Sequence, residues 1–205
     1  MSEYDEVLQR NVQAYDGVVE ERASGGAVSW KVEEHDGFAS NLVAAGWKSV
    51  VEIGAGTGFH SSRFAEAGFN VLATDPTPAM VAYCRSLGLE AMQIDVLGLE
   101  LEQPRDAAFA MNSLLHVPRA LFRSALERVA GVLRPGGLFY IGIYGGRAHE
   151  GVNEQDSYVP KRWFASHTDE ELVDAASSVF EVRDFHVTDL GRDELHFQSL
   201  TLRAT

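Results

Sequence analysis

Apolar positions along the chain follow two different periods, and each change of period marks a new element. Over residues 4–19 they recur every three or four positions, with charged and polar residues between them, which is typical of an amphipathic helix. A Ser-Gly-Gly run within residues 23–27 breaks this pattern. A second helix is predicted over residues 34–45 and ends at Gly46. We expect residues 1–46 to form a helical cap or lid.

The rest of the chain alternates between short apolar runs and helical patterns, with a turn between each pair. This order predicts parallel strands, because a crossover helix returns each strand in the same direction. The last two strands follow one another without a helix, so the final strand is predicted to run antiparallel to its neighbours. The predicted strands cover residues 49–53, 70–74, 90–94, 107–111, 138–144, 181–187 and 195–203, and the predicted helices cover residues 60–67, 79–86, 119–133 and 169–179.

These elements predict one α/β domain over residues 1–205, with a doubly wound, seven-stranded, mostly parallel sheet and helices on both faces. The central part, residues 47–144, is predicted to carry the ligand site, since ligands of such sheets bind at the carboxyl ends of the strands. Residues 145–167 form a long predicted loop on the substrate side. Residues 168–205 supply the last helix and the strand pair.

Charge and cysteine content limit the partners that this domain can have. The formal net charge is −13, which opposes binding to nucleic acid or to an anionic membrane surface and leaves a small molecule as the expected substrate. Cys84 is the single cysteine, as expected in a reducing compartment. The N-terminus is charged, and no apolar run reaches the length of a membrane span. We therefore expect a cytoplasmic protein that is a monomer or a homodimer.

The most informative motif is a G-x-G-x-G turn that follows the predicted strand 49–53. Gly54, Gly56 and Gly58 stand at alternate positions, which lets the backbone turn tightly and approach a ligand without a Cβ in the way. Dinucleotide sites instead carry G-x-G-x-x-G. Glu52 lies inside the strand, where a carboxylate would repel a pyrophosphate but suits a ligand with an ammonium and a sulfonium. The alternative is a tight turn that binds nothing.

With this motif the chain resembles the class I S-adenosylmethionine-dependent methyltransferases, whose cofactor fingerprint is E/D-x-G-x-G-x-G. The resemblance is most specific over residues 50–146 and includes the Arg-Pro-Gly-Gly turn at residues 134–137. It implies a Rossmann-like fold, S-adenosylmethionine as cofactor and S-adenosylhomocysteine as product. The implied cofactor-binding residues are Glu52, Gly54, Ala55, Gly56, Gly58, Asp75, Pro76, Met80, Asp95, Val96 and Asn112.

Two acids at strand ends have both a cofactor role and an ordinary alternative. Asp75 can accept hydrogen bonds from both hydroxyls of a ribose, or it can be a turn residue. By the resemblance, Asp95 accepts from the adenine amine and the backbone of Val96 faces the ring. The stretch 97–101 departs from the family pattern at this point, and a strand-end turn is the alternative.

Catalytic residues are harder to predict, because methyl transfer mainly requires that donor and acceptor be aligned. His116 is the leading candidate for a general base by its position, and a helix cap is the alternative. Tyr144 is expected to line the acceptor side or to be an ordinary packing residue. Cys84 lies in a helix and is a poor nucleophile candidate, and neither a metal site nor the N/D-P-P-Y/F motif of nucleic-acid amino methylation is present.

Two further residues have open interpretations. Arg162 either recognises a carboxylate or pairs with one of the many acids, and Tyr15 is either a lid residue or a core residue.

Two other function classes remain as alternatives to a methyltransferase. A nucleotide-dependent oxidoreductase predicts the other glycine spacing, whereas a non-catalytic S-adenosylmethionine-binding module has the same sequence signature as an enzyme.

Overall fold

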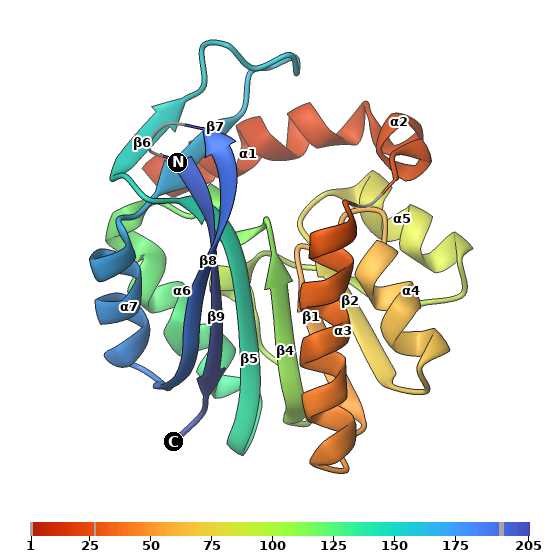
Figure 1. Cartoon of the computed structure of the whole chain (residues 1–205). Coiled ribbons are helices and arrows are strands. Elements are labelled where there is room, and N and C mark those ends of the chain that lie inside the picture. The colour runs from red at the N-terminus through yellow and green to blue at the C-terminus, as the bar shows by residue number, and fades with distance from the viewer. Residues whose placement is uncertain (1, 27, 193–194) are drawn as a thin grey trace.

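A computed structural model describes residues 2–26, 28–192 and 195–205 and contains a seven-stranded sheet within that part of the chain (Figure 1). The strand order is β3-β2-β1-β4-β5-β9-β8, with β1 to β5 parallel and β9 antiparallel to both of its neighbours. The predicted fold class, including the antiparallel last strand, is confirmed. The strands of this sheet are β1 (Ser49–Ile53), β2 (Asn70–Asp75), β3 (Glu90–Gln93), β4 (Arg105–Met111), β5 (Leu133–Gly145), β8 (Glu181–Arg192) and β9 (Leu195–Arg203).

Helices cover both faces of the sheet, because successive strand residues point to opposite sides. In β1, Val50 packs with residues of α3 and α4, whereas Val51 packs with residues of α6 and α7. Glu52 follows Val51 and therefore points toward the α4 side. No helix in the described ranges is long and apolar enough to cross a bilayer. The helices are α1 (Glu3–Asp16), α2 (Val19–Ser24), α3 (Ser29–Ala44), α4 (Phe59–Glu66), α5 (Pro78–Ser86), α6 (Arg119–Gly131) and α7 (Asp169–Ser177), with short 3₁₀ turns η1 (Val96–Gly98) and η2 (Leu114–His116).

The N-terminal cap differs in detail from its prediction. The single helix predicted over residues 4–19 is two helices, because the chain leaves α1 at Gly17 and re-enters a helix at Val19. Helix α2 continues to Ser24, so the break predicted over residues 23–27 begins two residues later, at Gly25. Ala27, at the end of that break, lies outside the described residues. Helix α3 begins five residues before its predicted start. Figure 1 shows α1 and α2 lying across the carboxyl ends of the strands.

Residues 145–167 were predicted to be a loop, and this was wrong in part. They contain β6 (His149–Val152) and β7 (Trp163–Ser166), which form a separate antiparallel pair. Strand β7 is held by α1, where the Asn11 amide donates to the Trp163 carbonyl at 3.0 Å and accepts from its N–H at 2.8 Å. This contact joins residues 152 positions apart, so the local pattern carries no sign of it.

Candidate active site

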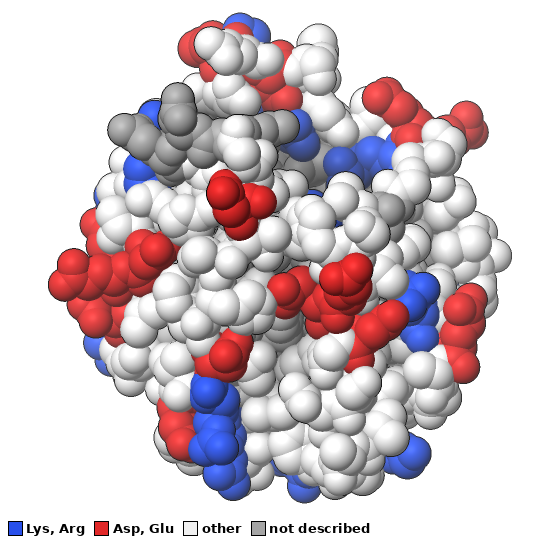
Figure 2. Space-filling model, viewed as in Figure 1, with Lys and Arg blue, Asp and Glu red and all other residues white. Residues whose placement is uncertain are grey.

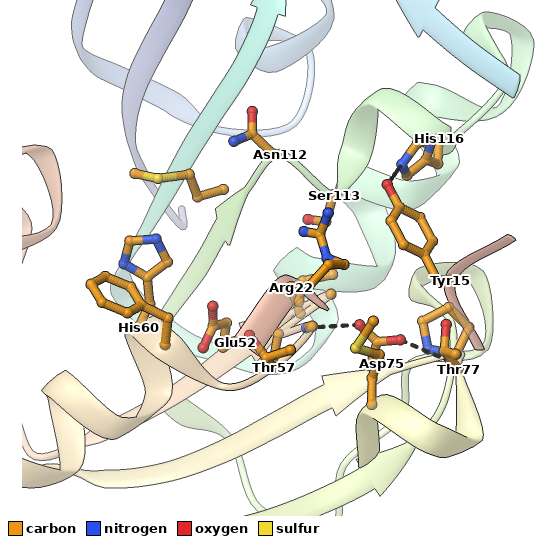
Figure 3. A pocket seen from close by; sticks show the side chains of 18 of the residues that line it. Tyr15, Arg22, Glu52, Thr57, His60, Asp75, Thr77, Asn112, Ser113 and His116 are labelled. Carbon is orange, nitrogen blue, oxygen red and sulfur yellow. Dashed lines mark hydrogen bonds between the residues drawn. The ribbon is translucent and has the colours of Figure 1, made fainter. Parts of the chain in front are cut away.

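A cavity of about 580 Å³ lies beneath α1 and α2, at the carboxyl ends of β1, β2 and β4 (Figures 1 and 3). It therefore occupies the place at which doubly wound sheets bind their ligands. Two predicted site residues, Gly58 and Tyr144, do not line it. The predicted residues that do are Glu52, Gly54, Ala55, Gly56, Asp75, Pro76, Met80, Asp95, Val96, Asn112 and His116.

The three glycines of the loop after β1 have different structural roles. Gly54 has φ +69°, and a Cβ there would lie 2.3 Å from the Cβ of Ser113, so close packing against the β4 loop requires glycine. Gly56 has φ +55°, and a Cβ would meet no protein atom within 4 Å. It therefore leaves its share of the cavity open to a ligand. Gly58 faces Cys84 and Leu89, and its role is to begin α4.

Glu52 is buried at the floor of the cavity, with 3% of its surface exposed. Its carboxyl accepts a short hydrogen bond from the Ser61 hydroxyl on α4. Burial raises the pKa of Glu52 to about 8, although the Ser61 hydrogen bond opposes the shift. Burial therefore favours the neutral acid where the sequence predicted a carboxylate, and a cation bound beside it would favour the charged form.

Asp75 at the end of β2 ties the two neighbouring loops together. One carboxylate oxygen accepts from the N–H of Gly56 at 2.9 Å and the other accepts from the N–H of Thr77 at 2.8 Å. Burial raises the pKa of Asp75, while these backbone hydrogen bonds favour its charged form. Each oxygen keeps a further lone pair, so the turn role and a ligand role are compatible.

Asp95 follows β3 and is held by two donors. Its Oδ2 accepts from the Tyr4 hydroxyl at 2.6 Å and from the N–H of Leu97 at 3.2 Å. Burial and the hydrogen bond to Asp95 raise the pKa of Tyr4 well above its usual value. The sequence analysis did not identify Tyr4 as a site residue, because it lies 91 positions from its partner.

The loop after β4 presents unsatisfied polar atoms. Asn112 has φ +57°, which is rare outside glycine, and its N–H donates to the Gly142 carbonyl at 2.7 Å. The Asn112 Oδ1 and the Ser113 Oγ are buried and have no hydrogen-bond partner among the described residues. Since buried polar atoms are normally paired, these two indicate a ligand with polar groups. Ser113 was not predicted.

His116 is part of a hydrogen-bonded chain that links α1, η2 and β7. Its Nδ1 lies 2.9 Å from the Trp163 carbonyl, which can only accept, so Nδ1 carries the proton. Its Nε2 therefore accepts from the Tyr15 hydroxyl at 2.8 Å. Burial lowers the pKa of His116 to about 4. Both ring nitrogens of this predicted base are thus engaged, and Tyr15 shields Nε2 (Figure 3).

Arg162 completes this chain by donating to the Tyr15 hydroxyl at 3.0 Å. The Arg162 side chain donates two hydrogen bonds to Asp156, each at 2.8 Å. Of the two interpretations of Arg162, the structure therefore has the ion pair with an acid of the chain. The ring of Tyr144 lies 5.3 Å from that of Phe197, and the Lys31 ammonium lies 4.9 Å from the centre of the Tyr144 ring.

Basic side chains that the sequence analysis did not single out also line the cavity. Arg22 enters from α2 and Lys31 from α3, while His60 lies at the start of α4. Among the described residues, no three His, Cys, Asp or Glu side chains converge as metal ligands would. Arg22, Lys31 and His60, the last neutral because burial lowers its pKa to about 3, were missed because a lone basic residue on a helix has no sequence signature.

Comparison with known proteins agrees with this geometry. A model of the methyltransferase domain matches residues 50–137, which run from β1 to the turn in β5. Residues 50–137 are therefore similar to a methyltransferase domain, in agreement with the resemblance of the sequence to the class I S-adenosylmethionine-dependent methyltransferases. The chain is 35% identical over 112 residues to the ubiquinone biosynthesis O-methyltransferase of Xanthomonas campestris, covering 51% of this chain and 46% of that one.

A second relative is the glycine/sarcosine/dimethylglycine N-methyltransferase of Actinopolyspora halophila, 42% identical over 65 residues, or 30% of this chain and 12% of that protein. The methyltransferase domain thus spans less than half the length of both relatives.

Solved structures share the fold over nearly the whole chain. The 1,6-didemethyltoxoflavin-N1-methyltransferase of Burkholderia thailandensis, with bound S-adenosylhomocysteine, has a TM-score of 0.75 at 20% identity and covers 100% of this chain and 92% of its own. The magnesium protoporphyrin IX methyltransferase of Synechocystis PCC 6803, with bound S-adenosylmethionine, has a TM-score of 0.70 at 15% identity and covers 97% of each chain.

Proposed function

We propose that this protein is an S-adenosylmethionine-dependent methyltransferase that acts on a small molecule by in-line methyl transfer. The observation that carries the proposal is the cavity itself, where Glu52, Gly56 and Asp75 come together at the ends of two adjacent strands. The unpaired Asn112 Oδ1 and Ser113 Oγ fit a ligand with a charged amino-acid end. The residues present therefore suit this cofactor.

Each predicted contact has a chemical reason in this cavity. Asp75 offers its remaining lone pairs to the ribose hydroxyls, and Asp95 with Val96 meets the adenine. Glu52, Asn112 and the open edge of Gly56 face the methionine end. Ala55, Pro76 and Met80 complete the walls, while Gly54 and Gly58 act by shaping the loop. When bound, S-adenosylmethionine supplies a methyl group already activated on a sulfonium.

The protein's own residues then align the acceptor and manage its proton. Because the Tyr15 hydroxyl donates to His116 Nε2, a proton of the acceptor would reach this nitrogen by way of that hydroxyl. Arg162 donates to that hydroxyl and would stabilise negative charge on it. We therefore assign His116 an indirect role as base, and Tyr144 a structural one.

We extend the proposal to organisation and context. Helices α1 and α2 form the lid, residues 47–144 hold the cofactor, and residues 145–167 wall the acceptor side. The charge of −13 and the single cysteine support a cytoplasmic monomer or homodimer that does not bind nucleic acid.

Calorimetry tests the cofactor. S-adenosylmethionine and S-adenosylhomocysteine are expected to bind with equal stoichiometry, and NAD is expected not to bind. Binding of NAD alone would favour the oxidoreductase alternative. Assays of S-adenosylhomocysteine release with glycine and sarcosine, named for one relative, and with phenols then address turnover. Tight cofactor binding without turnover of any amine, phenol or carboxylic acid would favour the non-catalytic module.

A further inference from the structure

Arg22 is an exposed cation that lines the cavity, and no ion pair between it and an acid is found among the described residues. Its guanidinium lies 5.0 Å from the centre of the Tyr15 ring, and its Nη1 donates to the Tyr158 hydroxyl at 3.1 Å. Within the described ranges, no carboxylate forms an ion pair with it, and its other N–H groups have no protein acceptor. Figure 3 shows the side chain directed into the cavity.

A second guanidinium lies against the same two rings. Arg162 is 3.6 Å from the centre of the Tyr158 ring and 5.3 Å from that of Tyr15. Its charge is matched by Asp156, through two hydrogen bonds of 2.8 Å. Both guanidinium groups lower the pKa of the nearby His116, and Arg22 also opposes the rise in the pKa of Asp75, although no ion pair joins them. Since no carboxylate in the described ranges contacts the Arg22 guanidinium, a ligand carboxylate can approach it.

Three acids that line the cavity are committed to other groups, and a fourth, Glu66, is exposed at the end of α4. Asp75 is held by backbone N–H groups, Asp95 is held by Tyr4, and burial favours the neutral form of Glu52. Figure 2 shows Lys and Arg side chains inside the hollow near the top of the molecule, with Asp and Glu spread over the surface around it.

We propose that Arg22 binds a carboxylate of the methyl acceptor, and that Tyr15 and Tyr158 form aromatic walls for the body of the acceptor. A guanidinium presents two parallel N–H groups that match a carboxylate. The inference rests on the proposed function and narrows its substrate class to carboxylic acids.

The carboxylate belongs to the acceptor rather than to the cofactor. Arg22 contacts Tyr158 of the segment 145–167, whereas the cofactor-binding candidates lie on the loops after β1, β2, β3 and β4 and on α5. Lys31 lines the same cavity near His60 of α4, since it lowers the pKa of His60. In that position Lys31 is available to the carboxylate of the cofactor. Arg22 therefore remains for the second substrate.

The experiment uses benzoate and benzamide, which differ in charge and share a planar aromatic body. The wild-type protein and the Arg22→Gln variant are first titrated with S-adenosylhomocysteine, and their affinities are expected to agree within about twofold. Each saturated complex is then titrated with both probes by calorimetry or ligand-observed NMR. We expect benzoate to bind the wild-type complex at least about tenfold more tightly than benzamide, and Arg22→Gln to abolish that difference.

Two controls separate the charge of Arg22 from its fork geometry and from the net charge of the protein. Arg22→Lys keeps the charge without the paired N–H groups and is expected to give intermediate benzoate affinity. Arg123→Gln removes one charge from the exposed face of α6 and is expected to bind both probes as the wild type does.

The possible failures are distinguishable. Absence of S-adenosylhomocysteine binding to the wild type contradicts the proposed function. Normal S-adenosylhomocysteine binding with no preference for benzoate, or with the same preference in Arg22→Gln, overturns the inference alone. A tenfold loss of S-adenosylhomocysteine affinity in Arg22→Gln also overturns it, because Arg22 would then serve the cofactor.

Discussion

Glu52 makes stability depend on pH in a way that one substitution removes. The side chain is buried, and burial raises its pKa from an ordinary value of 4.5 to about 8. In Glu52→Gln the amide oxygen can still accept from Ser61, but the group no longer titrates. The variant therefore isolates the effect of one proton.

The magnitude follows from proton linkage. Between pH 4.5 and about 8, the native protein holds a proton on Glu52 that the unfolded chain has released. Stability therefore falls as pH rises through this window, by about 1.4 kcal/mol per pH unit where the difference is one full proton. From about pH 5.5 to about pH 7.5, the wild type is expected to lose about 2.5 kcal/mol that Glu52→Gln keeps. This is a large part of the stability of an ordinary domain, which is about 5–15 kcal/mol.

Urea unfolding of both proteins without cofactor, at several pH values in this range, measures the effect. All other titrating groups are shared, so they cancel in the difference between the two stability curves. Curves that stay parallel would refute the reasoning, because they would mean that Glu52 is already ionised in the folded protein. A curve for the variant that falls more steeply than that of the wild type would refute its sign.

Three other predictions test the floor and walls of the cavity. Asp75→Ala is expected to weaken S-adenosylhomocysteine binding about a hundredfold in calorimetry, because it removes a charged hydrogen-bond acceptor. The control Cys84→Ser, beside the same loop, is expected to bind with the affinity of the wild type. Equal affinity in the two variants would remove the assignment of Asp75. Gly56→Ala is expected to lower the free energy of unfolding by about 1–2 kcal/mol, because φ is +55° there, and to block cofactor binding. Gly58→Ala is expected to lower the free energy of unfolding but to bind the cofactor once folded. Normal cofactor binding by Gly56→Ala would show that the ligand does not approach Gly56. Burial lowers the pKa of His60 to about 3, so the contribution of His60 to stability is lost as pH falls below 6.5. On going from pH 6.5 to about 4.5, His60→Phe is expected to keep about 2 kcal/mol of unfolding free energy that the wild type loses, as measured by urea unfolding. Identical acid sensitivity of the two proteins would contradict this expectation.

Local signals explain why much of the fold was predictable. Strand β1 has the predicted bounds, Ser49–Ile53, because an apolar run ends there at a glycine turn. The predicted N-cap Thr168 does accept from the N–H of Glu171, because capping depends on residues three positions apart. The short strands β6 and β7 were missed, because four-residue strands carry little pattern of their own.

The sequence by itself determined the fold class, the order of the seven strands along the chain, the antiparallel direction of the last strand and the glycine loop beside Glu52, because periodicity and turn chemistry act over a few residues. Only the tertiary structure decided that Tyr4 meets Asp95, that Tyr15 covers His116 and that burial favours the neutral form of Glu52. These outcomes depend on contacts across about a hundred positions and on burial, which sets the cost of charge at each site. A helix pattern shows which face is apolar, but not what that face will cover.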